Sequence, residues 1–186
     1  MPRVPLITGR EHVAAEYYPQ FDAVAESRGR VGGPFAALMH SPEVSARTAH
    51  LGAYLRFDSI LPGALREVTI LASAREANCP YEFSGHATLA RREGVSEEVI
   101  RALADRSAPA GLPPELAVPV AYVLELARTR KVSATTFQAA LDMLGLQALT
   151  ELTAILGYYT MLAFTLNAFE VTPAPEAERY WSDEDQ

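Results

Sequence analysis

The chain has 186 residues, of which 49% are apolar, and its 23 acidic and 16 basic residues give a formal net charge of −7. This length suits one domain, or two closely packed halves, with a substantial core, and the negative charge argues against nucleic acid as the main partner. With Cys79 as the one cysteine, no intrachain disulfide can form. Residues 1–10 contain two prolines and no apolar signal-peptide core, so we expect a soluble, cytoplasmic protein.

Prolines and capping residues divide the sequence into helices almost throughout. Ser41-Pro42-Glu43, for example, has the N-cap residue, the proline and the first-turn acid that are typical of a helix start. No stretch alternates apolar and polar residues as a strand would, so we predict an all-α fold. We expect helices over residues 11–27, 34–39, 41–56, 62–78, 80–94, 96–106, 114–131, 133–144 and 147–169.

Three features modify this pattern. Pro19 should interrupt or kink the first helix, and Gly145 should separate the last two. The most apolar run, 148–169, is broken by several polar residues, which favours a buried core helix rather than a membrane span. Because this helix is apolar on nearly every side, we expect a second subunit to help cover it. The acidic tail, 173–186, contains Tyr180 and Trp181 and should dock on the rest of the chain.

The segment from Cys79 to His86 contains reactive side chains at helical spacing. Pro80 fits the first position of a helix, which makes Cys79 its N-cap residue. Glu82 is three residues past Cys79, and His86 is four past Glu82, so the three side chains share one face. Since Phe83 lies on that face as well, we expect the face to point inward.

Glu67, on the preceding helix, also lies on an apolar face. The polar stripe of this helix is formed by Arg66, Thr69, Ser73 and Glu76, which we expect to face solvent. Glu67 lies off this stripe, in line with Ile70, Leu71 and Ala74. A carboxylate in an apolar setting is costly unless it is paired, and burial moves its pKa toward a range that suits a general base.

A structural interpretation of each residue stands beside the functional one. A single histidine is often a hydrogen-bonded core residue, a single buried cysteine is often inert, and a Glu–His pair four residues apart is often mere surface decoration. Four reactive residues on the inward sides of two consecutive helices favour a functional site. At a helix N-terminus, Cys79 should also have a pKa below the roughly 8.5 of a free thiol, unless a buried Glu67 or Glu82 carboxylate cancels this shift by repelling the thiolate.

These motifs resemble the carboxymuconolactone decarboxylase superfamily. The resemblance rests on Leu65-Arg66-Glu67-Val68, on Asn78-Cys79-Pro80-Tyr81-Glu82-Phe83 with His86, and on Ala90-Arg91-Arg92-Glu93-Gly94-Val95-Ser96. It is strongest over the core motif, 62–104, and weaker over a second helical half, 113–169. It implies the alkyl hydroperoxidase D-like fold, a bundle of about seven to nine helices, in one domain spanning 1–186. It also implies a homo-oligomer, usually a trimer or hexamer.

The resemblance implies two kinds of chemistry. In the hydroperoxidase branch a Cys-x-x-Cys pair works with a Glu and a His, but here Glu82 replaces the second cysteine, so that disulfide cycle cannot run within one chain. The decarboxylase branch needs no cofactor or metal, and Tyr81-Glu82-Phe83 resembles its Tyr-Glu-Trp segment. The leading hypothesis is therefore acid/base chemistry, as a decarboxylase or related lyase, on a small organic acid or lactone.

In this hypothesis the catalytic residues are Glu67, Cys79, Glu82 and His86, while Tyr158 or Tyr159 contributes a hydroxyl to the substrate. Arg66 and Arg75 are candidates for holding a substrate carboxylate. Two alternatives stay open. One is a thiol peroxidase that acts through Cys79 with an external thiol. The other is a metal-binding or non-catalytic oligomeric ring, in which Glu67, Glu82 and His86 would be the ligands. We expect no nucleic-acid or membrane partner.

Overall fold

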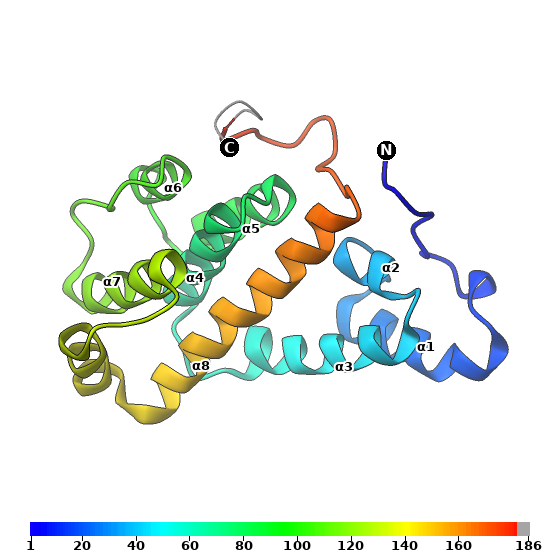
Figure 1. The fold of residues 1–186 in the computed structure, drawn as a ribbon, viewed down its shortest axis with the longest axis horizontal. Helices are drawn as coiled ribbons and strands as arrows, with labels where there is room; N and C mark the ends of the chain where they lie inside the picture. The colour runs from blue at the N-terminus through cyan, green and yellow to red at the C-terminus, as the bar shows by residue number, and fades with distance from the viewer. Residues whose placement is uncertain (182–186) are drawn as a thin grey trace. The chain divides into compact units, whose positions relative to one another are not determined.

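The computed structural model describes residues 1–181, and within them the chain is all-helical, with eight α-helices and no strand (Figure 1). The predicted fold class and helix number are thus confirmed. Short 3-10 turns over Arg10–His12 and Ala15–Tyr17 precede the first helix, and a π-helical turn over Tyr54–Asp58 follows the third. The helices are α1 (Tyr18–Arg28), α2 (Pro34–Leu38), α3 (Pro42–Ala53), α4 (Gly63–Glu76), α5 (Pro80–Arg92), α6 (Glu97–Ala104), α7 (Pro114–Thr129) and α8 (Ala134–Ala168).

The chain forms two compact units, and the prediction of a single domain stays a prediction. The first unit consists of residues 1–59 and 164–172 and contains α1, α2 and α3. Its core contains apolar side chains of these helices, among them Val24, Phe35 and Ala49. Pro19 does not kink a longer helix as predicted. It lies in the first turn of α1, where a proline costs no hydrogen bond, so the helix begins there instead of at residue 11.

The second unit consists of residues 60–163 and the chain from Pro173 onward, and it contains all the predicted site residues. Helix α4 is its centre, because it packs against α5, α6 and α7 (Figure 1). Its side chains are buried from Glu67 through Arg75. The polar stripe predicted to face solvent is therefore wrong at Thr69 and Ser73, which are 0% and 1% exposed. Their hydroxyls donate to carbonyls one turn earlier in the same helix, which offsets the cost of burying a polar side chain.

Helix α8 contains a break at Gly145, as predicted. This residue has φ 74° and ψ 167°, a conformation essentially confined to glycine, so two helical segments meet there. Within residues 1–181, α8 is long and apolar enough to span a membrane by length and composition alone. Its contacts are nevertheless those of a core helix: Ser73 of α4 donates to the Leu156 carbonyl at 3.3 Å, and the hydroxyls of Tyr122 and Thr153 lie 2.8 Å apart.

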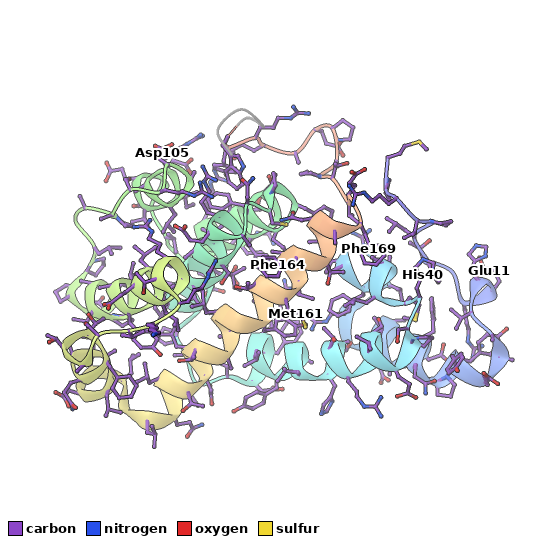
Figure 2. The ribbon with its side chains drawn as sticks, viewed as in Figure 1. Glu11, His40, Asp105, Met161, Phe164 and Phe169 are labelled. Atoms are coloured by element: carbon purple, nitrogen blue, oxygen red, sulfur yellow. The ribbon has the colours of Figure 1, made fainter. Side chains whose placement is uncertain are left out.

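One face of α8 is not covered within the described chain. Leu146, Met161 and Phe164 are 69%, 40% and 56% exposed, and Figure 2 labels the last two on this helix. The expectation that a second subunit covers α8 stays a prediction, as does the cytoplasmic location.

The tail docks on helices α5 and α6 of its own unit, as predicted. This holds for its residues up to 181, and residues 182–186 lie outside the described residues. The Glu178 carboxylate pairs with Arg91 at 2.9 Å and with Arg101 at 2.7 Å. The rings of Tyr180 and Trp181 pack on Phe83 of α5, with centroids 4.8 and 5.0 Å away. The tail therefore covers α5 beside the segment that carries Cys79 and Glu82.

Candidate active site

A tight corner between α4 and α5 brings the predicted site residues together. Asn78 has a positive φ of 51°, which asparagine tolerates better than most residues, and the Cys79 N–H donates to the Ala74 carbonyl at 2.7 Å. Cys79 is then the N-cap residue of α5, and Pro80 occupies its first turn. The two helices consequently run side by side, and residues far apart in the sequence face each other across the hairpin.

Glu67 of α4 and His86 of α5 meet directly. The His86 Nδ1 atom lies 2.7 Å from Glu67 Oε2, and the two side chains are 8% and 3% exposed. The predicted hydrogen-bonding reach between them is confirmed. A buried carboxylate and an imidazole at this distance can pass a proton between them without an intervening water.

Glu82 approaches the other nitrogen of the same ring. Its Oε2 atom lies 3.5 Å from His86 Nε2, and the Glu82 side chain is 7% exposed. The imidazole thus stands between two buried carboxylates, one on each helix. A carboxylate oxygen at each ring nitrogen fixes the orientation of the His86 ring.

Tyr159 of α8 forms the next wall of the site. Its ring meets the His86 ring edge-on, with centroids 5.0 Å apart and an interplanar angle of 82°. Tyr158 packs behind it, 5.2 Å from the Tyr159 ring. Of the two tyrosines proposed from the sequence, Tyr159 therefore contacts the imidazole, whereas Tyr158 supports Tyr159.

Cys79 lies at the N-terminus of α5 as predicted, but the prediction of a lowered pKa is wrong. Burial raises the pKa of Cys79 from 9.0 to about 12, because the 1%-exposed thiol would have to ionise away from water. The backbone N–H groups of Glu82 and Tyr81 oppose this rise, as expected for a helix N-terminus, while the Glu82 carboxylate adds to it. The effect of burial exceeds that of the helix end, so Cys79 is a neutral thiol at neutral pH.

The two arginines that were candidates for holding a substrate carboxylate have different surroundings in the structure. Arg75 is 5% exposed and donates to the Ala104 carbonyl at 2.5 Å, while its guanidinium stacks on Trp181 at 4.4 Å. It is thus engaged in joining α4 to α6 and to the tail. The Arg66 side chain is 16% exposed and turns toward the site, with Nε 3.7 Å from Glu67 Oε1.

The sequence did not indicate that the Arg66 side chain turns toward the Glu67 carboxylate. It placed Arg66 on a solvent stripe together with Thr69 and Ser73, and the polarity of those two residues was the misleading signal. Small hydroxyl side chains can bond within their own helix, so they are weak evidence of an exposed face.

Within residues 1–181, no group of three or more His, Cys, Asp or Glu side chains is arranged to hold a metal ion. Glu67, Glu82 and His86, the ligands considered in the metal-binding alternative, are close together. The Nδ1 atom of His86 is paired with Glu67 Oε2 at 2.7 Å, and its Nε2 atom faces Glu82 Oε2 at 3.5 Å.

Residues 42–123 match the model of the carboxymuconolactone decarboxylase family, a range that contains the whole α4–α5 hairpin. This match confirms, over residues 42–123, the predicted resemblance to the carboxymuconolactone decarboxylase superfamily. No curated protein matches the chain.

Solved structures show that the fold is the alkyl hydroperoxidase D-like one. An uncharacterized peroxidase-related protein from Ralstonia eutropha JMP134, an alkylhydroperoxidase AhpD core, superposes with a TM-score of 0.75 at 19% identity, covering 94% of this chain and 93% of that one. A similar protein from Silicibacter sp. TM1040 gives a TM-score of 0.71 at 16% identity, covering 97% and 98%. A cysteine-to-alanine variant of the debrominase Bmp8, in complex with 2,3,4-tribromopyrrole, gives 0.72 at 15% identity, covering 94% and 95%.

Proposed function

We propose that this protein is a cofactor-free acid/base enzyme, a decarboxylase or related lyase, that acts on a small organic acid or lactone. The observation that carries the proposal is the buried contact of 2.7 Å between Glu67 and His86. Such a pair, shielded from water and held by a second carboxylate, is suited to taking a proton from a substrate and returning it.

Each residue of the cluster has a role in this proposal. Glu67 is the general base, and His86 shares and relays the proton that Glu67 accepts. Glu82 orients the imidazole through Nε2, and Tyr159 holds its ring from the side. Cys79, as a neutral thiol, is a hydrogen-bond donor at the edge of the site rather than a nucleophile.

A second candidate is a thiol peroxidase that acts through Cys79. It is favoured by the position of this thiol at the N-terminus of α5 and by the likeness to peroxidase-related proteins. The raised pKa of Cys79 and the carboxylate of Glu82 in place of a second thiol disfavour it. The first candidate needs no thiolate, so it agrees better with the site.

Exchange of carbon-bound hydrogen for deuterium tests the proposal, because this exchange requires only the proton-transfer step of the reaction. A panel of small carboxylic acids and lactones is incubated with the protein in D₂O, and the loss of each proton signal is followed by NMR. We expect Glu67→Gln to slow exchange about 100-fold or more, because the amide cannot accept the proton, and His86→Ala to slow it similarly.

The matched controls are Glu98→Gln on α6 and His50→Ala on α3, which alter exposed side chains of the same types. Cys79→Ser should retain substantial exchange. The peroxidase candidate predicts the opposite ranking, with hydroperoxide consumption in the presence of an added thiol abolished by Cys79→Ser. Exchange that is lost in Cys79→Ser and unchanged in Glu67→Gln would refute the acid/base proposal.

A further inference from the structure

Arg66 is an arginine whose hydrogen-bonding capacity is not used by its neighbours. Its Nε atom is buried and has no hydrogen-bond partner among residues 1–181. The nearest carboxylate oxygens are those of Glu67, 3.7 Å from Nε, and of Glu93, 3.8 Å from Nη2. A guanidinium that binds a carboxylate normally makes two parallel hydrogen bonds of about 2.7–2.9 Å, so both contacts are ion pairs without a hydrogen bond.

The position of Arg66 relates it to the proton-transfer pair. Glu67 uses Oε2 for His86 and presents Oε1 toward Arg66. The guanidinium therefore lies next to the oxygen of Glu67 that the imidazole does not bind. If Arg66 binds the carboxylate of a small molecule, the carbon atoms next to that carboxylate lie beside Glu67, the proposed base.

Glu93 shows that a carboxylate fits beside Arg66. A Cβ atom at Gly63, the first residue of α4, would lie 1.9 Å from Glu93 Oε2, so the absence of a side chain at position 63 makes room for this carboxylate. Glu93 is the residue that ends α5, and its side chain is 44% exposed. It can turn into solvent without uncovering the core, which distinguishes it from the 3%-exposed Glu67.

We infer that Arg66 is the carboxylate-binding residue of the site, and that the carboxylate of a small organic acid replaces Glu93 beside its guanidinium. This inference rests on the proposed function for its location and names the anionic group by which the substrate is recognised. The Glu93 carboxylate lies beside the Arg66 guanidinium in this structure, and it moves into solvent when the ligand carboxylate binds there. Neutral lactones and amides without a free carboxylate are bound weakly.

Binding of inert probes tests this inference independently of turnover. Propionate and benzoate are titrated into the protein and compared with propionamide and benzamide, which have nearly the same shape without the charge. NMR shifts of the protein report the dissociation constants. We expect the acids to bind at least about tenfold more tightly than the amides, and Arg66→Gln to abolish this difference. Glu93→Gln should tighten acid binding several-fold, because it removes the competing carboxylate.

Arg92→Gln, which alters an exposed arginine next to Glu93, is the matched control and should leave binding unchanged. Arg66→Lys, which keeps the charge and loses the planar fork, should bind the acids with intermediate affinity, and it keeps the test valid if Arg66→Gln proves unstable in a thermal melt. Equal binding of acids and amides, no detectable binding of either, or unchanged acid binding in both Arg66 variants would overturn the inference.

The outcomes also separate this inference from the proposed function. Acid binding that depends on Arg66, with no deuterium exchange in any bound acid, supports the carboxylate site and contradicts the acid/base enzyme. Exchange that depends on Glu67 and is indifferent to Arg66 contradicts the carboxylate site alone.

Discussion

The ionisation of Cys79 provides a quantitative test of how strongly this site excludes water. Replacing Cys79 by serine removes the thiol while keeping a similar volume, so the difference between the two proteins isolates the thiolate. With the pKa raised from 9.0 to about 12, the thiolate fraction at pH 8 falls from about one in ten to about one in ten thousand. The buried environment therefore lowers the thiolate population about a thousandfold.

The thiolate absorbs ultraviolet light more strongly than the thiol, so the difference in absorbance between wild-type protein and Cys79→Ser, followed against pH, reports this equilibrium directly. We expect no inflection below pH 10 in the folded protein and an ordinary thiol titration after unfolding in denaturant. The denatured sample is the control for an intact cysteine. An inflection at or below pH 8.5 in the folded protein would refute the argument that burial exceeds the effect of the helix N-terminus, and it would favour the peroxidase candidate.

Three further predictions concern the tail, α8 and the assembly. The pKa of Glu178 is lowered by a hydrogen bond from Tyr180 and by its pairing with Arg91 and Arg101. The contribution of the two arginine pairs to docking the tail is therefore present above pH 4.5 and is lost as the pH falls below it. Trp181, the one tryptophan, should report this release as a red shift of fluorescence that Glu178→Gln produces already at neutral pH. Gly145→Ala should lower the free energy of unfolding by about 1–3 kcal/mol because of its backbone conformation, whereas Gly157→Ala, inside the helix, should raise it slightly in the same denaturant titration. Light scattering should give a mass above the 20.2 kDa of one chain, most simply that of a trimer or hexamer, and a value near 20.2 kDa would contradict self-association.

The local features of the site could be predicted from the sequence. Cys79, Glu82 and His86 belong to a single helix, and the Cys79-Pro80 pair defines where that helix begins. Their relative placement follows from helical geometry alone. The proximity of Glu67 was also predictable, because only a short corner separates α4 from α5 and a short connection forces adjacent helices to be neighbours.

Properties that depend on distant segments were decided only by the tertiary structure. The pKa of Cys79 depends on how completely neighbouring segments, together with its own helix, exclude water from the thiol, and no spacing within residues 79–86 reveals that. The surroundings of Arg66 include Glu93 from the far end of α5, whose carboxylate lies in the room left by Gly63. Spacing along one helix establishes which side chains share a face. How deeply they are buried, and which groups they pair with, depends on all the segments that pack against that face in the folded chain.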